Sequence, residues 1–156
     1  MNTVHEGADL CSTCHSNVTS FSDYRNINVS GVDYDEDGTV EGLYYEIEGV
    51  RNILYQAMQR YAQEKLGESI GWLDQYPYFF KDTNNDGVIS KDEAVVSNAF
   101  SDFSPRLMRA AYNFHFSLKD PAGYVHNGKY ILQLLYDSLE DLSQVVKVEF
   151  NLSNRP

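Results

Sequence analysis

The chain has 156 residues, a net charge of −11 at pH 7 and 42% hydrophobic residues. This length predicts a single domain that can bury a core, and the negative charge argues against nucleic acid and anionic membrane surfaces as partners. No apolar run is long enough for a transmembrane helix, so we expect no transmembrane segment.

Residues 1–30 read as an irregular segment that carries Cys11-Ser12-Thr13-Cys14-His15. Cys-x-x-Cys-His is the attachment sequence of c-type haem. We expect Cys11 and Cys14 to form thioethers and His15 to bind the iron from the proximal side. A thioredoxin-like pair would need a strand before Cys11, and a zinc site would need two more ligands at zinc spacing. We therefore expect one haem c per chain.

The haem motif also predicts a location. Haem is attached to Cys-x-x-Cys-His outside the cytoplasm, so we expect an extracytoplasmic protein that is periplasmic, or secreted and at the cell surface. No signal peptide is visible, and we expect that a signal or upstream segment was removed or omitted.

His5 stands six residues before Cys11 and does not easily fold back onto the same haem. His5 could therefore bind a different haem, and the alternative is an ordinary exposed or packed histidine that binds none.

Residues 33–38 read Asp-Tyr-Asp-Glu-Asp-Gly. Alternating carboxylates followed by glycine form the first half of an EF-hand-type calcium loop. The twelfth position is Tyr44, which cannot supply a bidentate carboxylate, so we expect a lengthened loop that closes with Glu46. The alternative is an acidic surface turn. The expected ligands of this first site are Asp33, Asp35, Asp37, Thr39 and Glu46.

Residues 43–66 show the longest helical pattern, and Gly67 is its natural stop. Met58 lies on this apolar stripe, so we expect a core residue and not an axial iron ligand. We expect a second, short helix over Gly71–Phe80, perturbed by Pro77. The stripe of the long helix comprises Ile47, Val50, Leu54, Met58 and Tyr61.

Residues 82–93 meet every requirement of a twelve-residue EF-hand loop. Gly87 allows the bend, and Glu93 supplies two oxygens from position twelve. We expect helices over 78–81 and 93–101 to flank this loop, and one or two Ca²⁺ ions per chain. The expected ligands of this second site are Asp82, Asn84, Asp86, Val88, Ser90 and Glu93.

Two further helices are predicted in the last third of the chain. Ser104 caps a helix over 105–118 whose apolar positions are Leu107, Met108, Ala111, Tyr112 and His115. Asn127 caps the final helix, about 128–142, and residues 145–150 alternate as in a short edge strand or a tail paired with another chain. The apolar face of the final helix comprises Ile131, Leu134, Leu135, Ser138, Leu139 and Leu142.

The predicted fold is mainly α: a small helical c-type cytochrome domain with long loops and two EF-hand-like calcium loops. Residues 1–156 form one domain, in which 1–30 attach the haem and 31–156 form a helical calcium-binding body.

The segment at His126 carries a resemblance. His126-Asn127 is followed by a helix of the type Lys-Tyr-Ile-Leu-Gln-Leu-Leu, which resembles the distal-histidine segment of multihaem c-type cytochromes. Residues 37–48 resemble a calcium-binding segment that accompanies it. The resemblance implies a haem with two axial histidines, His15 and His126, and it implies that His5 serves a different haem. His115 remains a rival distal ligand, or a packed core histidine.

This chain departs from the family because it has one haem motif and not several. We therefore expect partners that bring other haems close: other haem proteins or further copies of the chain, in a homo-oligomer or filament. The expected function is electron transfer without enzymatic activity, and the calcium is structural. The alternatives are a haem enzyme or ligand sensor with an open distal site, and a module that opens on binding calcium.

Overall fold

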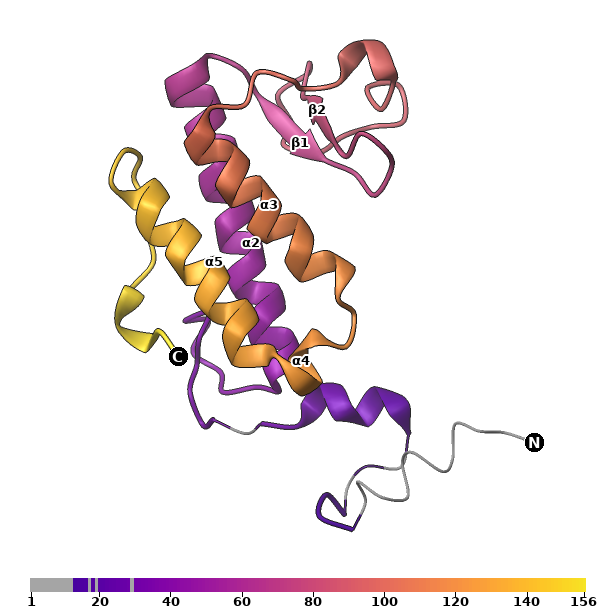
Figure 1. Ribbon diagram of the computed structural model, residues 1–156, viewed down its shortest axis with the longest axis vertical. Coiled ribbons are helices and arrows are strands. Elements are labelled where there is room, and N and C mark those ends of the chain that lie inside the picture. The colour runs from indigo at the N-terminus through magenta and orange to yellow at the C-terminus, as the bar shows by residue number, and fades with distance from the viewer. Residues whose placement is uncertain (1–12, 17, 19, 29) are drawn as a thin grey trace, which may run out of the picture.

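The structure is a computed structural model that describes residues 13–16, 18, 20–28 and 30–156. It is mainly helical, as predicted, with three long helices side by side and one two-stranded sheet beside the helices over 43–61 and 105–119 (Figure 1). Within the described residues, no helix combines the length and the apolar character needed to cross a membrane. The elements are η1 (Phe21–Asn26), α2 (Leu43–Tyr61), η2 (Ala62–Leu66), β1 (Ile70–Trp72), β2 (Phe79–Lys81), η3 (Val96–Asn98), α3 (Pro105–Lys119), α4 (Gly123–His126), α5 (Gly128–Ser143) and η4 (Leu152–Asn154).

Helix α2 is the centre of the molecule and carries the predicted apolar stripe. All five stripe residues are buried, and Met58 lies fully inside the core. The π-helical turn η2 continues the helix, and Gly67 ends it in the left-handed conformation with a φ of 73°. Glycine tolerates this conformation because it has no Cβ. The predicted extent of the helix is confirmed.

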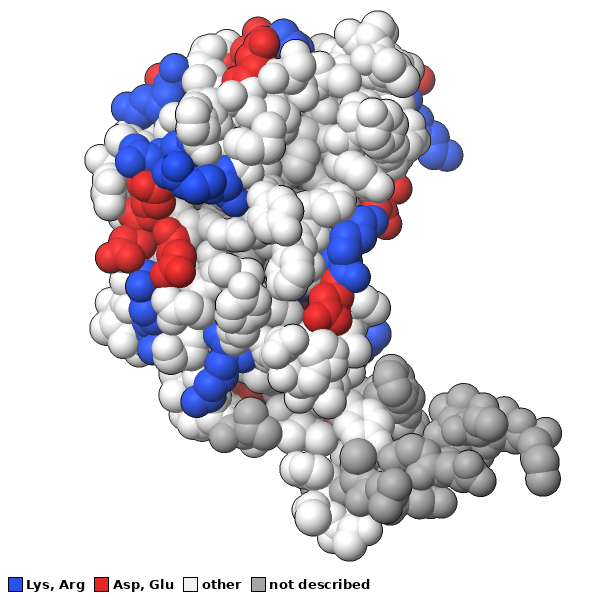
Figure 2. Space-filling model, viewed as in Figure 1, with Lys and Arg blue, Asp and Glu red and all other residues white. Residues whose placement is uncertain are grey.

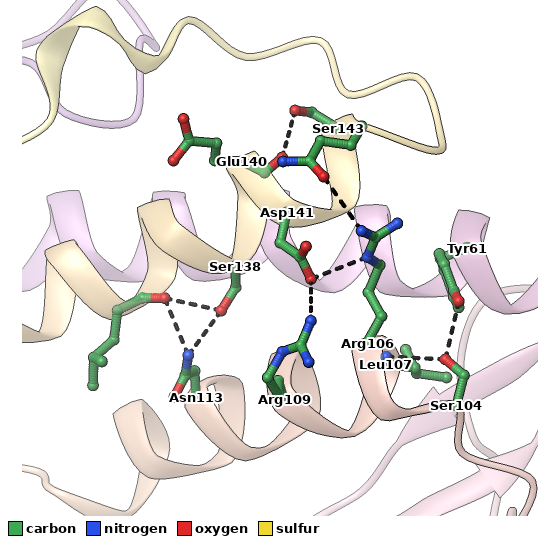
Figure 3. A network of polar contacts seen from close by, with 12 residues as sticks. Tyr61, Ser104, Arg106, Leu107, Arg109, Asn113, Ser138, Glu140, Asp141 and Ser143 are labelled. Atoms are coloured by element: carbon green, nitrogen blue, oxygen red, sulfur yellow. Dashed lines mark hydrogen bonds and ion pairs between the residues drawn. The ribbon is translucent and has the colours of Figure 1, made fainter.

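Helices α3 and α5 pack on α2 and on each other. The predicted cap of α3 is confirmed, since the Ser104 side chain accepts a hydrogen bond from the Leu107 amide. Polar side chains join α3 to α5 along one edge: Arg106 and Arg109 both bind Asp141, at 3.1 and 3.0 Å (Figure 3). Burial opposes ionisation of Asp141, but the two arginines lower its pKa below the usual value.

The predicted apolar face of α3 is wrong in part. Met108 and Tyr112 are 50% and 69% exposed, whereas Ala110 and Phe114 are buried. Helix α3 has neighbours on two sides, α2 and α5, so its buried face follows the groove between them and not the one stripe chosen from the sequence. On α5 the prediction is confirmed except at Leu134, which is only half-buried.

The helix predicted over 71–80 is wrong. Strands β1 and β2 form an antiparallel hairpin there, with Trp72 opposite Phe79, and the Leu73 amide donates to the Tyr78 carbonyl at 2.9 Å. The Trp72 amide binds the Tyr55 hydroxyl of α2 at 2.9 Å. A side chain at Gly71 would lie 2.6 Å from Ile89. Contacts with distant parts of the chain therefore override the local helical spacing.

Two further predicted elements differ from the structure. The second acidic loop follows strand β2 and precedes the 3-10 turn η3, so helices do not flank it as they would in an EF-hand. Residues 145–150 form no strand in the described part of the chain. Val146 is instead buried in the core, and the Lys147 carbonyl accepts a hydrogen bond from Arg60 at 2.6 Å. Side-chain packing thus replaces strand pairing in this tail.

The beginnings of α2 and α5 meet at the end of the helical layer that faces the N-terminal segment (Figure 1). Gly128 packs on Leu43, because a Cβ at Gly128 would lie 2.2 Å from a Leu43 methyl group. The Leu43 amide donates to the Ile27 carbonyl at 3.3 Å, and Asn28 binds the Glu41 carbonyl at 2.6 Å. These contacts fix the segment after the haem motif to the start of α2.

Candidate functional site

A cavity of about 580 Å³ lies where the N-terminal segment meets α2, α4 and α5. Both histidines predicted as axial ligands, His15 and His126, line it. They are 111 residues apart in the sequence (126 − 15), and the fold brings them to one space. The walls also include Tyr24, Ile27, Leu43, Tyr124, Val125 and Tyr130.

The described part of the haem motif is accessible. Cys14 and His15 are exposed, and the Cys14 thiol is free. Both residues line a second, more polar cavity of about 370 Å³, and since His15 also lines the first, it stands between the two spaces. Cys11 and His5 lie outside the described residues.

His126 is the last residue of α4, a single turn that the sequence did not predict as a separate helix. Its side chain is 54% exposed, and its Nε2 lies 3.7 Å from Oδ1 of Asp120. Asn127 occupies the cap position of α5 as predicted, but its side chain makes no capping hydrogen bond. Its carbonyl instead accepts the Ile131 amide at 3.0 Å. The kink between α4 and α5 leaves His126 at the cavity wall.

The cavity has the size and lining of a cofactor pocket. Such pockets hold about 300–1,000 Å³ and are mostly apolar with a few placed polar groups. Val125 and Tyr130 are 61% and 56% exposed at its wall, so a bound apolar group would remove them from water. Imidazoles are common iron ligands of haem, and His15 and His126 both line this cavity, while Cys14, next to His15, offers a thiol for covalent attachment. The residues present therefore fit a haem.

His115 does not line this cavity. Its ring packs against Tyr78 at 4.4 Å and against Trp72 at 6.4 Å, between α3 and the hairpin. Burial and the nearby charge of Lys119 lower its pKa below the usual value. Its surroundings are those of a packed histidine.

The first acidic loop gathers its carboxylates around one point. Oxygens of Asp33, Asp35 and Asp37 lie within 4.8 Å of one another. Asp33 accepts the Gly38 amide at 3.0 Å, and Asp37 accepts the amide of Thr39 at 2.7 Å. Burial, followed by the charges of neighbouring carboxylates, raises the pKa of Asp35 to about 6. A divalent cation bound between these carboxylates would offset the repulsion among their negative charges.

The second loop repeats this hydrogen-bond pattern. Asp82 accepts the Gly87 amide at 2.7 Å, as Asp33 accepts that of Gly38. Asn84 accepts the Asp86 amide at 2.9 Å, and Asp86 accepts the Val88 amide at 2.9 Å. The carboxylates of this loop are less tightly gathered than those of the first.

The backbone of the two loops also matches. The fourth position has a positive φ in both, 62° at Glu36 and 61° at Asn85. The sixth position is a glycine with positive φ in both, 93° at Gly38 and 84° at Gly87. Both loops thus wrap their backbone amides around the first acidic side chain. The likeness is in the loops themselves and not in the elements beside them.

Glu93 closes the second loop. Its Oε1 accepts the Thr83 amide at 2.8 Å, and its Oε2 accepts the amide and hydroxyl of Ser90 at 3.0 and 2.8 Å. Hydrogen bonds from the Ser90 amide, and then from the Thr83 and Ser90 hydroxyls, lower the pKa of Glu93 to about 2. The carboxylate is therefore ionised at neutral pH.

Glu46 has the same relation to the first loop. It stands on the first turn of α2, is 1% exposed, and accepts the Tyr34 amide at 2.7 Å and the Glu41 amide at 2.9 Å. Tyr34 and Thr83 are the second residues of their loops, so Glu46 and Glu93 close their loops in the same way. The hypothesis of a lengthened loop ending at Glu46 agrees with this geometry. The side-chain atoms expected to bind the metal in both loops are oxygens, which are the ligands that Ca²⁺ prefers.

Two residues near the cavity were missed from the sequence. Asp120 is not among the expected site residues, although its carboxylate lies beside His126. Tyr124 packs on Tyr44 with ring centres 5.3 Å apart and lines the cavity. Their closeness to His126 along the chain was the one signal that could have indicated them.

Comparison with known proteins gives a partial match. The C-type polyheme cytochromes OmcB and OmcC of Geobacter sulfurreducens are each 35% identical to this chain over 82 residues. The match covers 47% of this chain and 11% of each relative, so the chain spans only about a tenth of their length. About half of the chain is thus homologous to part of these proteins. No protein-family model matches the chain, and no solved structure matches it.

Proposed function

We propose that this chain, which is related over about half its length to polyheme c-type cytochromes, is an extracytoplasmic electron carrier with one covalently attached haem c. The observation that carries the proposal is the shared cavity: His15 of the Cys-x-x-Cys-His motif and His126 line the same space. Such an electron carrier catalyses no reaction of its own.

Each residue has a defined part in this proposal. Cys11 and Cys14 would hold the haem covalently, and His15 and His126 would bind its iron, His15 as the proximal and His126 as the distal ligand. Bound haem c supplies a one-electron iron couple. Two imidazole ligands leave no open coordination position for a substrate, and they favour a lower potential than a methionine ligand would. Tyr124 and Leu43 line the cavity wall and would contact the haem.

Calcium has a structural part in the proposal. We assign one ion to the loop at Asp33 and one to the loop at Asp82, closed by Glu46 and Glu93. The support is the repeated arrangement of oxygen donors and backbone amides in both loops. The first loop runs directly into the start of α2, where Leu43 lines the haem cavity. Calcium there would hold the cavity wall in place.

The partners in this proposal carry further haems. A single haem passes electrons only when another comes close, and the matched relatives are named polyheme cytochromes. We propose that other haem proteins or further copies of this chain supply these neighbours, in an oligomer or filament. His5 is then available to a haem of another subunit.

The haem ligands are tested by optical and EPR spectra of the purified haem protein, its mass in solution, and two matched variants. We expect the haem to stay on the protein in acid acetone and the iron to be low-spin and six-coordinate. His126→Ala should give a high-spin or solvent-ligated iron, whereas His115→Ala should keep the parent spectrum.

Two results would contradict the ligand assignment. A five-coordinate parent spectrum would favour the haem enzyme or sensor, and a low-spin spectrum that survives His126→Ala but not His115→Ala would make His115 the ligand. A strictly monomeric parent at all concentrations would remove the self-association part alone.

A further inference from the structure

Asp120 begins the turn that carries His126. Its carbonyl accepts the Gly123 amide at 3.1 Å, and this contact starts the single turn of α4. A Cβ at Gly123 would lie 3.1 Å from the Asp120 carboxylate and 2.2 Å from Ile131. Because Gly123 has no side chain, the Asp120 carboxylate can pack against the turn of α4 and lie near the His126 ring.

The Asp120 carboxylate lies beside the His126 ring, at a distance somewhat longer than a hydrogen bond. Oδ1 of Asp120 lies 3.7 Å from Nε2 of His126, and the Asp120 side chain is 27% exposed. Among the described residues, this is the one polar contact of the His126 ring. Asp120 also lines a cavity of about 230 Å³ on the far side of Tyr124, together with Glu48 and Arg51. The carboxylate thus stands behind the histidine and outside the haem cavity.

An imidazole that binds a metal through one nitrogen keeps a proton on the other, and that N–H is usually held by a carboxylate, a carbonyl or water. A carboxylate in this place fixes the ring orientation and makes the ligand nitrogen a stronger donor. It also places a negative charge near the metal, which favours the more oxidised state.

We propose that Asp120 is the positioning residue of His126: its carboxylate accepts the imidazole N–H and thereby sets the strength of the distal ligand. This inference rests on the proposed function, in which His126 binds the haem iron. Asp120 touches neither iron nor haem and acts through the histidine alone. The consequence is a tightly held sixth ligand and a lowered midpoint potential.

The test compares Asp120→Asn with Glu48→Gln in the haem-loaded protein. Glu48→Gln is the matched control because it removes the same charge from the same 230 Å³ cavity without a contact to His126. Asp120→Asn should stay low-spin and six-coordinate, since His126 remains. Its midpoint potential should rise. Cyanide should bind the ferric protein about ten-fold more tightly, because removing a group that holds a metal ligand typically weakens that ligand by at least this factor. Asp120→Glu should restore part of both values.

The outcomes separate this inference from the ligand assignment on which it rests. Equal potentials and cyanide affinities in Asp120→Asn and Glu48→Gln would overturn the role of Asp120, while His126→Ala still changed the spectrum. A parent spectrum unchanged in His126→Ala would overturn the ligand assignment itself. If Asp120→Asn lowers the melting temperature but leaves potential and cyanide binding at control values, Asp120 only stabilises the turn, and the inference is wrong.

Discussion

At the scale of single residues, His126 and His115 have very different surroundings in the fold. His126 follows a short turn and faces a cavity, whereas His115 lies on a long helix against two aromatic rings. Burial costs a charged imidazole much of its hydration, so the packed histidine resists protonation. The same residue type therefore suits a metal ligand in one place and a packing role in the other.

The partly buried position of His115 predicts an acid-sensitive fold. Its pKa is lowered in the folded state, so the unfolded chain, with a pKa near ~6.5, takes up this proton first as the pH falls. Stability is therefore full above pH ~6.5 and is lost as the pH falls toward the lower folded pKa. Urea unfolding at pH 7 and pH 5 should show a smaller loss in His115→Gln than in the parent chain.

Lys119→Gln is the control for this prediction, because the charge of Lys119 also lowers the pKa of His115. It should reduce the acid sensitivity less than His115→Gln does, since burial is the larger cause. An identical loss of stability between pH 7 and pH 5 in the parent and His115→Gln would show that His115 does not titrate differently in the two states.

At the scale of elements, the haem cavity depends on where helices begin. Helices α2 and α5 start beside each other, and the close approach of Gly128 to Leu43 sets their spacing. Leu43 lines the cavity, as does Gly128 itself. The polar contacts in Figure 3 join the opposite part of α5 to α3, at Asp141 and Ser138. Packing therefore fixes α5 at both of its ends.

Gly128→Ala tests this junction. Alanine normally stabilises a helix interior by about 1 kcal/mol relative to glycine. Here its Cβ would meet Leu43 at 2.2 Å, and overpacking of this kind typically costs about 1–3 kcal/mol. We expect a net loss in the free energy of unfolding by denaturant, together with a changed haem absorption spectrum.

Gln133→Ala is the matched control for Gly128→Ala, since Gln133 lies on the same helix and does not line the haem cavity. It should leave both measurements close to the parent values. A gain in stability from Gly128→Ala would show that the helix ends are not tightly packed.

At the scale of the whole molecule, the two acidic loops lie at opposite ends of the helical layer. The first joins the N-terminal segment to α2, and the second follows the hairpin beside the C-terminal half of α2 (Figure 1). Tyr136 donates from α5 to the Tyr34 carbonyl of the first loop at 2.6 Å, and Gln59 donates from α2 to the Gly87 carbonyl of the second at 2.9 Å. Acidic and basic side chains are interspersed over the face seen in Figure 2. Charge compensation by calcium would therefore be local to the loops.

Removal of calcium should lower the stability of the whole fold. An ion present at 100 times its Kd stabilises the folded state by about 2.7 kcal/mol, which corresponds to a fall in Tm of about 5–10 °C for a chain of this size on chelation with EGTA. Glu93→Gln should reduce this calcium-dependent shift by removing the carboxylate that closes the second loop.

Asp92→Asn is the control for Glu93→Gln, because Asp92 is an exposed neighbour and not an expected ligand. It should keep the full calcium-dependent shift. A melting curve that is the same in EGTA and in excess calcium, after prolonged dialysis against chelator, would contradict the structural role of calcium.

Features that depend on neighbouring residues could be predicted from the sequence. The helices over 43–66, 105–118 and 128–142 follow from apolar spacing, and their observed bounds agree within a few residues. The loop conformations follow from acidic side chains that bind amides two to five residues further on, with Gly38 and Gly87 at the sharp bends. The haem motif itself is also local, since its five residues are consecutive in the sequence.

Features that depend on distant residues were decided by the tertiary structure. The hairpin at 70–81 replaced a predicted helix because α2 and Ile89 supply contacts that its own sequence does not contain. The meeting of His15 and His126, the separation of His115 from them, and the place of Asp120 depend on how α2 and α5 pack. Local spacing reports which side of an element is apolar, but it carries no information about which other element will cover that side. Only the packing of the three helices could therefore determine which histidines share the cavity.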